Sequence, residues 1–174
     1  MLLVGCLTLA LASQATAQGI ADLPKIEGES FAGHHVVLPD AASGNIAILI
    51  FGFSKASKIP TGDWARRISK DFNSQPALEL YQLPVLEDVP RFIRGMVISG
   101  IRKGVPEAER DRFVPIINGE AELKKLVSYK EPDDAYLVVL NRSGKIVEQM
   151  HGPFTEGAYS RLRAQLQQPL NGSR

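Results

Sequence analysis

Two serines three positions apart, Ser54 and Ser57, stand where this chain could hold a ligand. They follow an apolar run at residues 46–53, which predicts a central strand in a sheet that is covered on both faces. Ligands of open α/β sheets usually bind at the carboxyl ends of such strands. Ser54, Lys55 and Ser57 therefore form a candidate binding corner, where hydroxyls and backbone N–H groups could bind a polar group. The alternative interpretation is that the serines only cap the following helix.

The sequence predicts no catalytic residue, no metal site and no cofactor. A nucleophilic serine needs an adjacent base, and no histidine lies in a Gly-x-Ser-x-Gly motif. The three histidines, His34, His35 and His151, could meet across a sheet as a metal site. However, neighbouring residues of a strand point to opposite faces, so His34 and His35 cannot both contribute. Copper(I) carriers also favour sulfur ligands, which are scarce here.

A second candidate surface is the basic side of a predicted helix at residues 90–103, which carries Arg91, Arg94 and Arg102. These arginines could bind an acidic partner, although a charged helix side is more often a solvated face. The whole chain has 20 basic and 19 acidic residues. This balance argues against nucleic-acid binding and gives the molecule no overall attraction to acidic membranes.

The amino-terminal residues predict export. Residues 1–12 are almost entirely apolar, and Ala15-Thr16-Ala17 has the small-x-small pattern that a signal peptidase cuts. We therefore expect a signal peptide at residues 1–17, a periplasmic or secreted protein, and a partner in the cell envelope. The apolar run is shorter than the about 20 residues that span a bilayer, so no transmembrane anchor is expected after cleavage. Alternatively, a lipid could be attached to Cys6, the only cysteine, because residues 3–6 match a lipoprotein cleavage pattern.

The rest of the chain predicts an α/β domain at residues 34–168, between a lead-in segment at 18–33 and a disordered tail at 169–174. In the predicted helix from Thr61, Trp64, Ile68 and Phe72 recur every four residues, so Trp64 is expected in the core. The other predicted elements are strands at 31–39, 46–53 and 78–84, a helix at 90–103, an edge strand at 113–117, a short helix capped by Asn118, a hairpin at 136–150 and a final helix capped by Thr155.

This order of elements, with Ser54 directly after the first central strand, resembles the thioredoxin superfamily. The resemblance implies a three-layer sandwich whose central mixed sheet has helices on both faces, with an extra amino-terminal strand and an insert before the carboxyl-terminal hairpin. Thioredoxins carry a Cys-x-x-Cys pair at the positions of Ser54 and Ser57, and a cis-proline at the position of Ala135 or Tyr136. Here all three are replaced. Serine cannot form the mixed disulfide of thiol exchange, so we expect a redox-inactive protein.

A narrower resemblance is to the fungal mitochondrial assembly factors for the ATP synthase Fo sector, which also lack the cysteine pair. The shared residues are Phe53-Ser54, Ile93-Arg94, Ile101-Arg102, Ala135-Tyr136-Leu137, Gly144-Lys145-Ile146 and Gly152. This resemblance implies an assembly or chaperone role.

The predicted function is that of a redox-inactive, exported, thioredoxin-like protein that binds another envelope protein and assists its assembly or stability. Its binding corner would comprise Ser54, Lys55, Ser57, Ala135 and Tyr136. The alternatives are a divergent thiol oxidoreductase or peroxidase-type enzyme and a metal-binding maturation factor.

Overall fold

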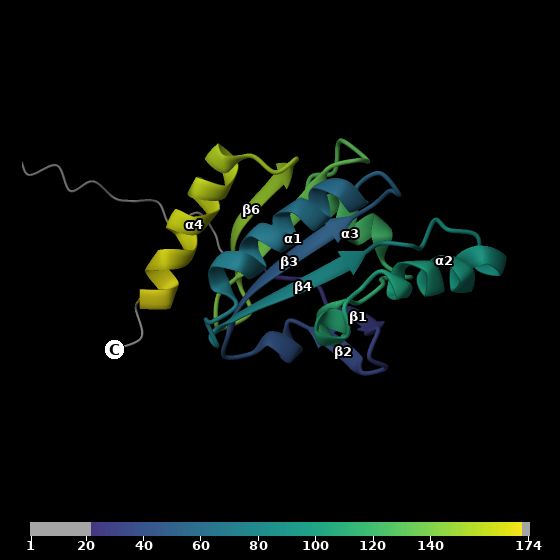
Figure 1. Ribbon diagram of the computed structural model, residues 1–174, viewed down its shortest axis with the longest axis horizontal. Helices are drawn as coiled ribbons and strands as arrows, with labels where there is room; N and C mark the ends of the chain where they lie inside the picture. Colours follow the sequence, from purple (N-terminus) through teal and green to yellow (C-terminus); the bar gives the residue numbers. More distant parts are fainter. Residues whose placement is uncertain (1–21, 172–174) are drawn as a thin grey trace, which may run out of the picture.

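A four-stranded mixed sheet forms the centre of the structure, a computed structural model that describes residues 22–171 (Figure 1). The predicted signal peptide and Cys6 lie outside the described residues. The strand order is β4-β3-β5-β6, in which β3 and β4 are parallel and the other two pairings are antiparallel. The strands are β3 (Ile46–Gly52), β4 (Leu78–Pro84), β5 (Ala135–Leu140) and β6 (Ile146–Gly152). The predicted mixed α/β architecture is confirmed.

Both faces of β3 are buried because a layer of elements packs on each. The side chains of Ile46, Ile48 and Ile50 share one core with α1 (Lys58–Phe72) and α4 (Glu156–Asn171). The alternate side chains share a second core with α3 (Glu120–Leu126) and the amino-terminal hairpin on the other face. This alternation follows from the two-residue period of a strand, and it explains why the sequence of β3 is apolar throughout.

The amino-terminal strands differ from the prediction. β1 (Ile26–Glu29) and β2 (His35–Leu38) pair with each other in a separate two-stranded sheet, so no extra strand joins the central sheet. Phe31, predicted within a strand, lies in the turn between them, where its ring stacks on Phe113 at a centroid distance of 5.0 Å. The sequence missed β1 because its four residues alternate only briefly and lie in the segment assigned as a lead-in.

Helix α1 begins at Lys58 rather than Thr61, so Pro60 lies in its first turn. A proline is tolerated there because the first backbone N–H groups of a helix have no intrahelical partner. Trp64 and Ile68 are buried as predicted, and the Trp64 Nε1–H donates to the backbone oxygen of Gly152 at 3.1 Å. The helix is therefore fastened to the far edge of the sheet as well as to β3.

The segment between β4 and β5 includes the predicted insert, around residues 105–132. It contains α2 (Arg91–Lys103), a 3-10 turn at Glu107–Arg112, and α3. Residues 113–117 follow the edge of β4 through two isolated parallel bridges, which is shorter than the predicted edge strand. The residue at the amino-terminal cap of α3 is Gly119, with a φ of 83°, and not the predicted Asn118. At the other end of the chain, α4 continues past Pro169 to Asn171.

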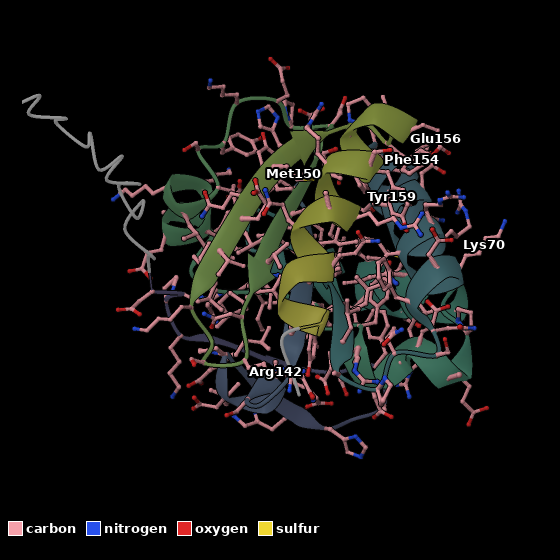
Figure 2. All side chains as sticks on the ribbon, turned by 90° about the vertical axis from the view of Figure 1, so that its left-hand side faces the viewer. Lys70, Arg142, Met150, Phe154, Glu156 and Tyr159 are labelled. Atoms are coloured by element: carbon pink, nitrogen blue, oxygen red, sulfur yellow. The ribbon has the colours of Figure 1, made fainter. Side chains whose placement is uncertain are left out.

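Tyr159 fastens α4 to α1 (Figure 2). Its hydroxyl donates to the Asp71 carboxylate at 2.7 Å, and the Arg67 guanidinium lies over its ring, 4.8 Å from the centroid. Burial, together with the hydrogen bond to Asp71, raises the pKa of Tyr159 to about 12. Phe154 packs edge-on against Trp64 in the same interface. α1 and α4 therefore form one layer, and α4 holds α1 in place against β3.

Removal of the Trp64 side chain should destabilise the whole fold. We expect Trp64→Ala to lower the free energy of unfolding by about 3–5 kcal/mol, since it empties a core site and removes the bond to Gly152. Urea unfolding would measure this. The matched control is Ile59→Ala in the same helix, where a side chain that is 72% exposed should cost about 0.5 kcal/mol or less. Equal costs for both variants would contradict this placement of α1.

Candidate functional site

The candidate binding corner lies at the carboxyl edge of the sheet, as predicted. Gly52, the last residue of β3, pairs with Pro84 at the end of β4 and with Ala135 at the start of β5. Ser54 follows two residues later and leads into α1. The corner therefore stands at the mouth of a βαβ unit, where ligands of α/β sheets usually bind.

The two serines are hydrogen-bonded to each other's backbone. The Ser57 N–H donates to Ser54 Oγ at 3.0 Å, and the Ser54 N–H donates to Ser57 Oγ at 3.3 Å. The Ser57 hydroxyl donates in turn to the Ser54 carbonyl oxygen at 2.7 Å. We call this set of three bonds the serine clasp. It closes the turn that leads into α1, whose amino-terminal cap residue is Ser57.

Asp133 completes the hydrogen bonding of the clasp. The Ser54 hydroxyl donates to Asp133 Oδ1 at 2.6 Å, from a loop that precedes β5. Each serine hydroxyl thus donates its one proton and accepts one N–H. Within the described residues the serine hydroxyls donate to Asp133 and to the Ser54 carbonyl oxygen, and no hydrogen bond joins either hydroxyl to a histidine base. The clasp therefore serves the local structure of the loop before α1, although neither serine side chain makes the cap bond to α1 that the alternative interpretation expected.

Close packing behind the clasp explains a glycine at the end of β3. A Cβ atom at Gly52 would meet Ser57 Oγ at 2.6 Å and Thr61 Cγ2 at 3.2 Å. Ser57 is only 2% exposed, so its hydroxyl has no room to retreat. A side chain at position 52 would therefore separate the two serines.

Ala135 and Tyr136 do not form part of the binding surface, contrary to the prediction. Both are at most 1% exposed, because β5 lies between β3 and β6. The Tyr136 hydroxyl accepts the N–H groups of Lys130 and Glu131 at 2.9 and 3.0 Å and donates to the Glu131 carbonyl oxygen at 3.0 Å. Tyr136 therefore positions, from beneath, the loop that carries Asp133. Both positions opposite the corner have trans peptide bonds, and the one cis bond within residues 22–171 precedes Pro39.

The exposed part of the corner consists of Lys55 and the first turn of α1. Lys55 is exposed, and Ile59 is 72% exposed although it is a large apolar residue. Ile59 was not predicted as part of this surface, because the predicted helix begins at Thr61 and Ile59 would then lie in a loop. It missed Asp133 because a contact across 79 positions leaves no local pattern. A partner at the corner would meet Lys55 and Ile59 rather than the serines.

The arginines of α2 divide into two groups. Arg94, predicted on the partner-binding face, turns back onto the preceding loop: its Nη2 donates to the carbonyl oxygens of Glu87 and Val89 at 2.7 and 2.9 Å. It is a structural residue, which corrects the prediction. Arg91 and Arg102 are exposed, as a binding face requires.

The structure does not bring the three histidines together. His34 and His35 belong to the β1–β2 hairpin, while His151 lies in β6, where its ring stacks on Tyr136 at 5.3 Å. Within the described part of the chain, no group of three or more His, Cys, Asp or Glu side chains could hold a metal ion.

None of the helices at residues 22–171 combines the length and apolar character needed to cross a bilayer.

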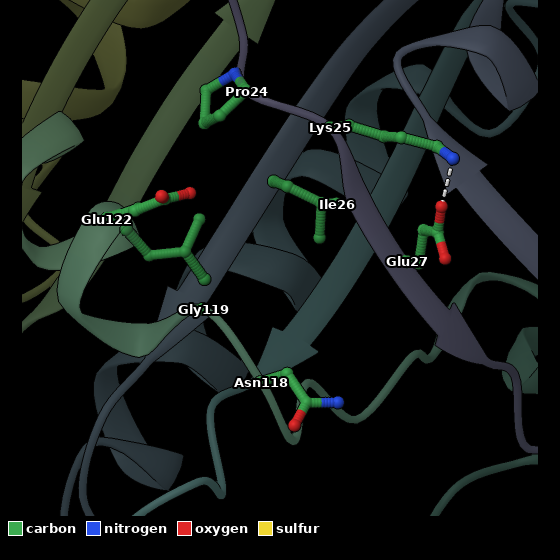
Figure 3. A pocket seen from close by; sticks show the side chains of 8 residues that line it. Pro24, Lys25, Ile26, Glu27, Asn118, Gly119 and Glu122 are labelled. Atoms are coloured by element: carbon green, nitrogen blue, oxygen red, sulfur yellow. Dashed lines mark ion pairs between the residues drawn. The ribbon is translucent and has the colours of Figure 1, made fainter.

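Two hollows lie away from the corner. One, of about 230 Å³, lies between β1 and the start of α3, where Lys25 and Glu27 form an ion pair at its rim (Figure 3). The other, of about 500 Å³, is lined by residues of α1 and β4 and by the 3-10 turn near Glu109. No residue of the corner lines either hollow. Neither of these two hollows is therefore part of the corner.

Solved structures with the same fold belong to redox proteins and to an assembly protein. A protein of Chlorobium tepidum assigned as thiol:disulfide interchange protein DsbE matches with a TM-score of 0.60 and 16% identity, over 87% of this chain and 96% of its own. BsSco, a member of the Sco family of cytochrome c oxidase assembly proteins, matches with a TM-score of 0.63 and 11% identity, over 89% of this chain and 96% of its own.

An exposed lipoprotein thioredoxin, Etrx1 of Streptococcus pneumoniae, matches with a TM-score of 0.58 and 12% identity, over 82% of this chain and 99% of its own. The chain therefore has the thioredoxin-like fold. No family model matches the sequence, and no curated protein matches it either. The narrower resemblance to the Fo assembly factors rests on the sequence motifs alone.

The serine clasp should behave as one cooperative unit. We expect Ser54→Ala and Ser57→Ala each to lower the free energy of unfolding by about 1–2 kcal/mol, because each leaves a backbone N–H of the turn without its acceptor. The double variant should cost less than the sum of the two, since both changes break the same bonds. Urea unfolding of the three variants would measure this. Ser69→Ala, an exposed serine of α1, should change stability by about 0.5 kcal/mol or less. Strict additivity would show that the two serines act independently.

Proposed function

We propose that this chain is an exported, redox-inactive protein of thioredoxin-like fold that binds another envelope protein at the carboxyl edge of its sheet and assists the assembly of that protein. One observation carries the proposal: the positions of the redox pair hold two serines whose hydroxyls are hydrogen-bonded within the turn that leads into α1. A corner that is closed in this way keeps its shape and its exposed rim, and it has no sulfur for thiol exchange.

The proposed absence of thiol chemistry follows from the two serines that occupy the corner. Thiol exchange needs an accessible thiolate that attacks a disulfide and forms a mixed disulfide. At the corner, Ser57 is buried and the Ser54 hydroxyl donates a hydrogen bond to Asp133. The only cysteine of the sequence, Cys6, falls within the predicted signal peptide. The alternatives of a thiol oxidoreductase or peroxidase would need a reactive group from outside the described residues.

A protein partner is favoured by the rim of the corner. Ile59 exposes most of a large apolar side chain in the first turn of a helix whose own core residues, such as Trp64, are fully covered. Lys55 stands four positions before it, so an apolar and a cationic group lie together at the mouth of the sheet. Apolar anchors flanked by charge are typical of protein interfaces.

An assembly role is supported by two likenesses of different kinds. The fold is shared with BsSco, whose family assembles cytochrome c oxidase, although this likeness concerns the fold alone. The sequence motifs around Phe53-Ser54 and Ala135-Tyr136-Leu137 resemble the Fo assembly factors, which also lack the cysteine pair. Neither likeness names the partner, which we infer to be a protein of the envelope in which this chain would reside.

The proposal can be tested with the purified chain in two assays. Insulin disulfide reduction and hydroperoxide reduction should both stay at the level of buffer. A rate well above buffer in either assay would overturn the redox-inactive part of the proposal. The chain should be purified from its native host, so that any bound reactive group is retained.

The binding part needs a photo-crosslinking side chain at position 55 and capture from envelope extract. We expect one predominant protein partner, whose yield falls about tenfold in an Ile59→Ser variant. The matched control carries the crosslinker at Arg142 and the change Val147→Ser, an exposed cation and an exposed apolar residue at the opposite edge of the sheet. Equal capture from both edges would place the binding surface elsewhere.

A further inference from the structure

Helix α2 is only sparsely covered by the rest of the structure. Figure 1 shows it projecting from the body beyond the end of β4, with open space around most of its length. None of its 13 residues is fully buried. A helix this short is marginal without tertiary packing, and this one also contains Gly95 and Gly100. Its outward face is therefore a surface that a partner could cover and stabilise.

The outward face carries two large apolar side chains one turn apart. Phe92 is 88% exposed and Met96 is 71% exposed, and they stand four positions apart on the same side of the helix. Gly95, Ser99 and Gly100, which are small and exposed, are also neighbours of this pair on the helix surface. The half-buried apolar residues, including Val97 and Ile101, lie on the inward side. The exposure of Phe92 and Met96 is thus separate from the contact that attaches α2 to the body.

Cationic side chains stand on and beside this face. By the period of a helix, Lys103 lies on the side of Phe92 and Met96, and Arg91 and Arg102 lie on its flank. All three are exposed, and α2 contains no acidic residue. The acidic residues just before it turn the other way: the Glu87 carboxylate accepts the N–H of Glu120 at 2.6 Å, and the Asp88 carboxylate lies 3.5 Å from Lys124. A chain of net charge +1 therefore concentrates positive charge on one projecting helix.

We propose that α2 docks on an anionic lipid surface, with Phe92 and Met96 inserted at the headgroup level and Arg91, Arg102 and Lys103 placed among the lipid phosphates. A basic amphipathic helix with an exposed aromatic residue has the composition of an interfacial membrane helix. Charge complementarity identifies the occupant as anionic, because the cations on this face have no acidic side chain beside them within α2.

A lipid surface fits this face better than an acidic protein does. The face consists of two apolar side chains separated by small residues, and neither hollow of the structure adjoins it to receive a partner's side chain. A bilayer needs no complementary shape and accepts isolated apolar side chains beside cations. The proposal does not depend on the function assigned to the corner, since α2 and the first turn of α1 expose different residues.

Vesicle sedimentation tests this proposal directly. Phosphatidylcholine vesicles are compared with vesicles that contain about 30% phosphatidylglycerol, at low and at high salt. We expect binding only to the anionic vesicles, with a loss of about tenfold or more at high salt. The measurement is made on the full chain and on the chain from Gln18 onward, because the apolar residues 1–12 could bind lipid by themselves.

Two pairs of variants separate α2 from the rest of the surface. Phe92→Ser with Met96→Ser should reduce binding about tenfold or more, while Ile117→Ser with Val147→Ser, which removes two exposed apolar residues elsewhere, should leave it unchanged. Arg102→Gln with Lys103→Gln should reduce it similarly, while Lys70→Gln with Arg142→Gln, which removes the same charge elsewhere, should not. All of these side chains are exposed, so circular dichroism should show folded variants.

A tryptophan at position 92 reports insertion independently. The chain has one tryptophan, Trp64, which is buried and serves as the background. In Phe92→Trp, the added emission should shift to shorter wavelength with anionic vesicles and be quenched by brominated lipid. No binding to either vesicle type, as expected of a helix that recognises an acidic protein, would overturn the proposal. So would equal binding to both types, or binding that survives the Phe92 and Met96 changes.

Discussion

The serine clasp is the interaction on which the functional end of this molecule depends. Its hydrogen bonds join the end of β3 to the start of α1, and the bond from Ser54 to Asp133 extends the connection to the loop before β5. A hydroxyl suits this role because it donates one proton and accepts others at short range, whereas a thiol is a weak donor and acceptor. A hydroxyl at these positions therefore forms local hydrogen bonds that a thiol would form only weakly.

The corner is supported from two sides, which separates structural residues from those free to bind. The clasp fixes it from above, and Tyr136 fixes the Asp133 loop from below, within an aromatic cluster that includes Phe53, Tyr129 and His151. The side chains that take part in this support are mostly buried or fully hydrogen-bonded. Lys55 and Ile59 stay exposed on the resulting rigid frame. This arrangement lets the corner present a fixed surface at little entropic cost on binding.

The sequence predicted the elements whose signals are local and periodic. The continuous apolar run of β3, the four-residue spacing of Trp64 and Ile68, and the turn of the final hairpin each correspond to observed structure. The sequence also predicted Ser54 at the carboxyl edge of the sheet, because a residue that directly follows a strand of a parallel pair lies at the carboxyl end of that strand. These predictions succeeded because each depends on residues within about one element of each other.

What the sequence missed depends on contacts between distant segments. The direction of Arg94 is set by the carbonyl groups of Glu87 and Val89, and the burial of Tyr136 by β6 and the loop at Lys130. No periodicity distinguishes an arginine that binds its own loop from one that faces solvent. β1 was missed for a similar reason, since it is defined by its pairing with β2 and by its packing on α3, not by its own four residues.

Two exposed surfaces, the rim of the corner and the outward face of α2, belong to the helices that follow β3 and β4. Each combines apolar side chains with cations. The clasp makes the junction between strand and helix at the start of α1.

Amide hydrogen exchange of Ser57, followed by NMR in the wild-type chain and in Ser54→Ala, tests that junction most directly. The account predicts slow exchange in the wild type, because the Ser57 N–H donates to Ser54 Oγ, and fast exchange in the variant. Exchange in the wild type as fast as that of an unstructured peptide would contradict it.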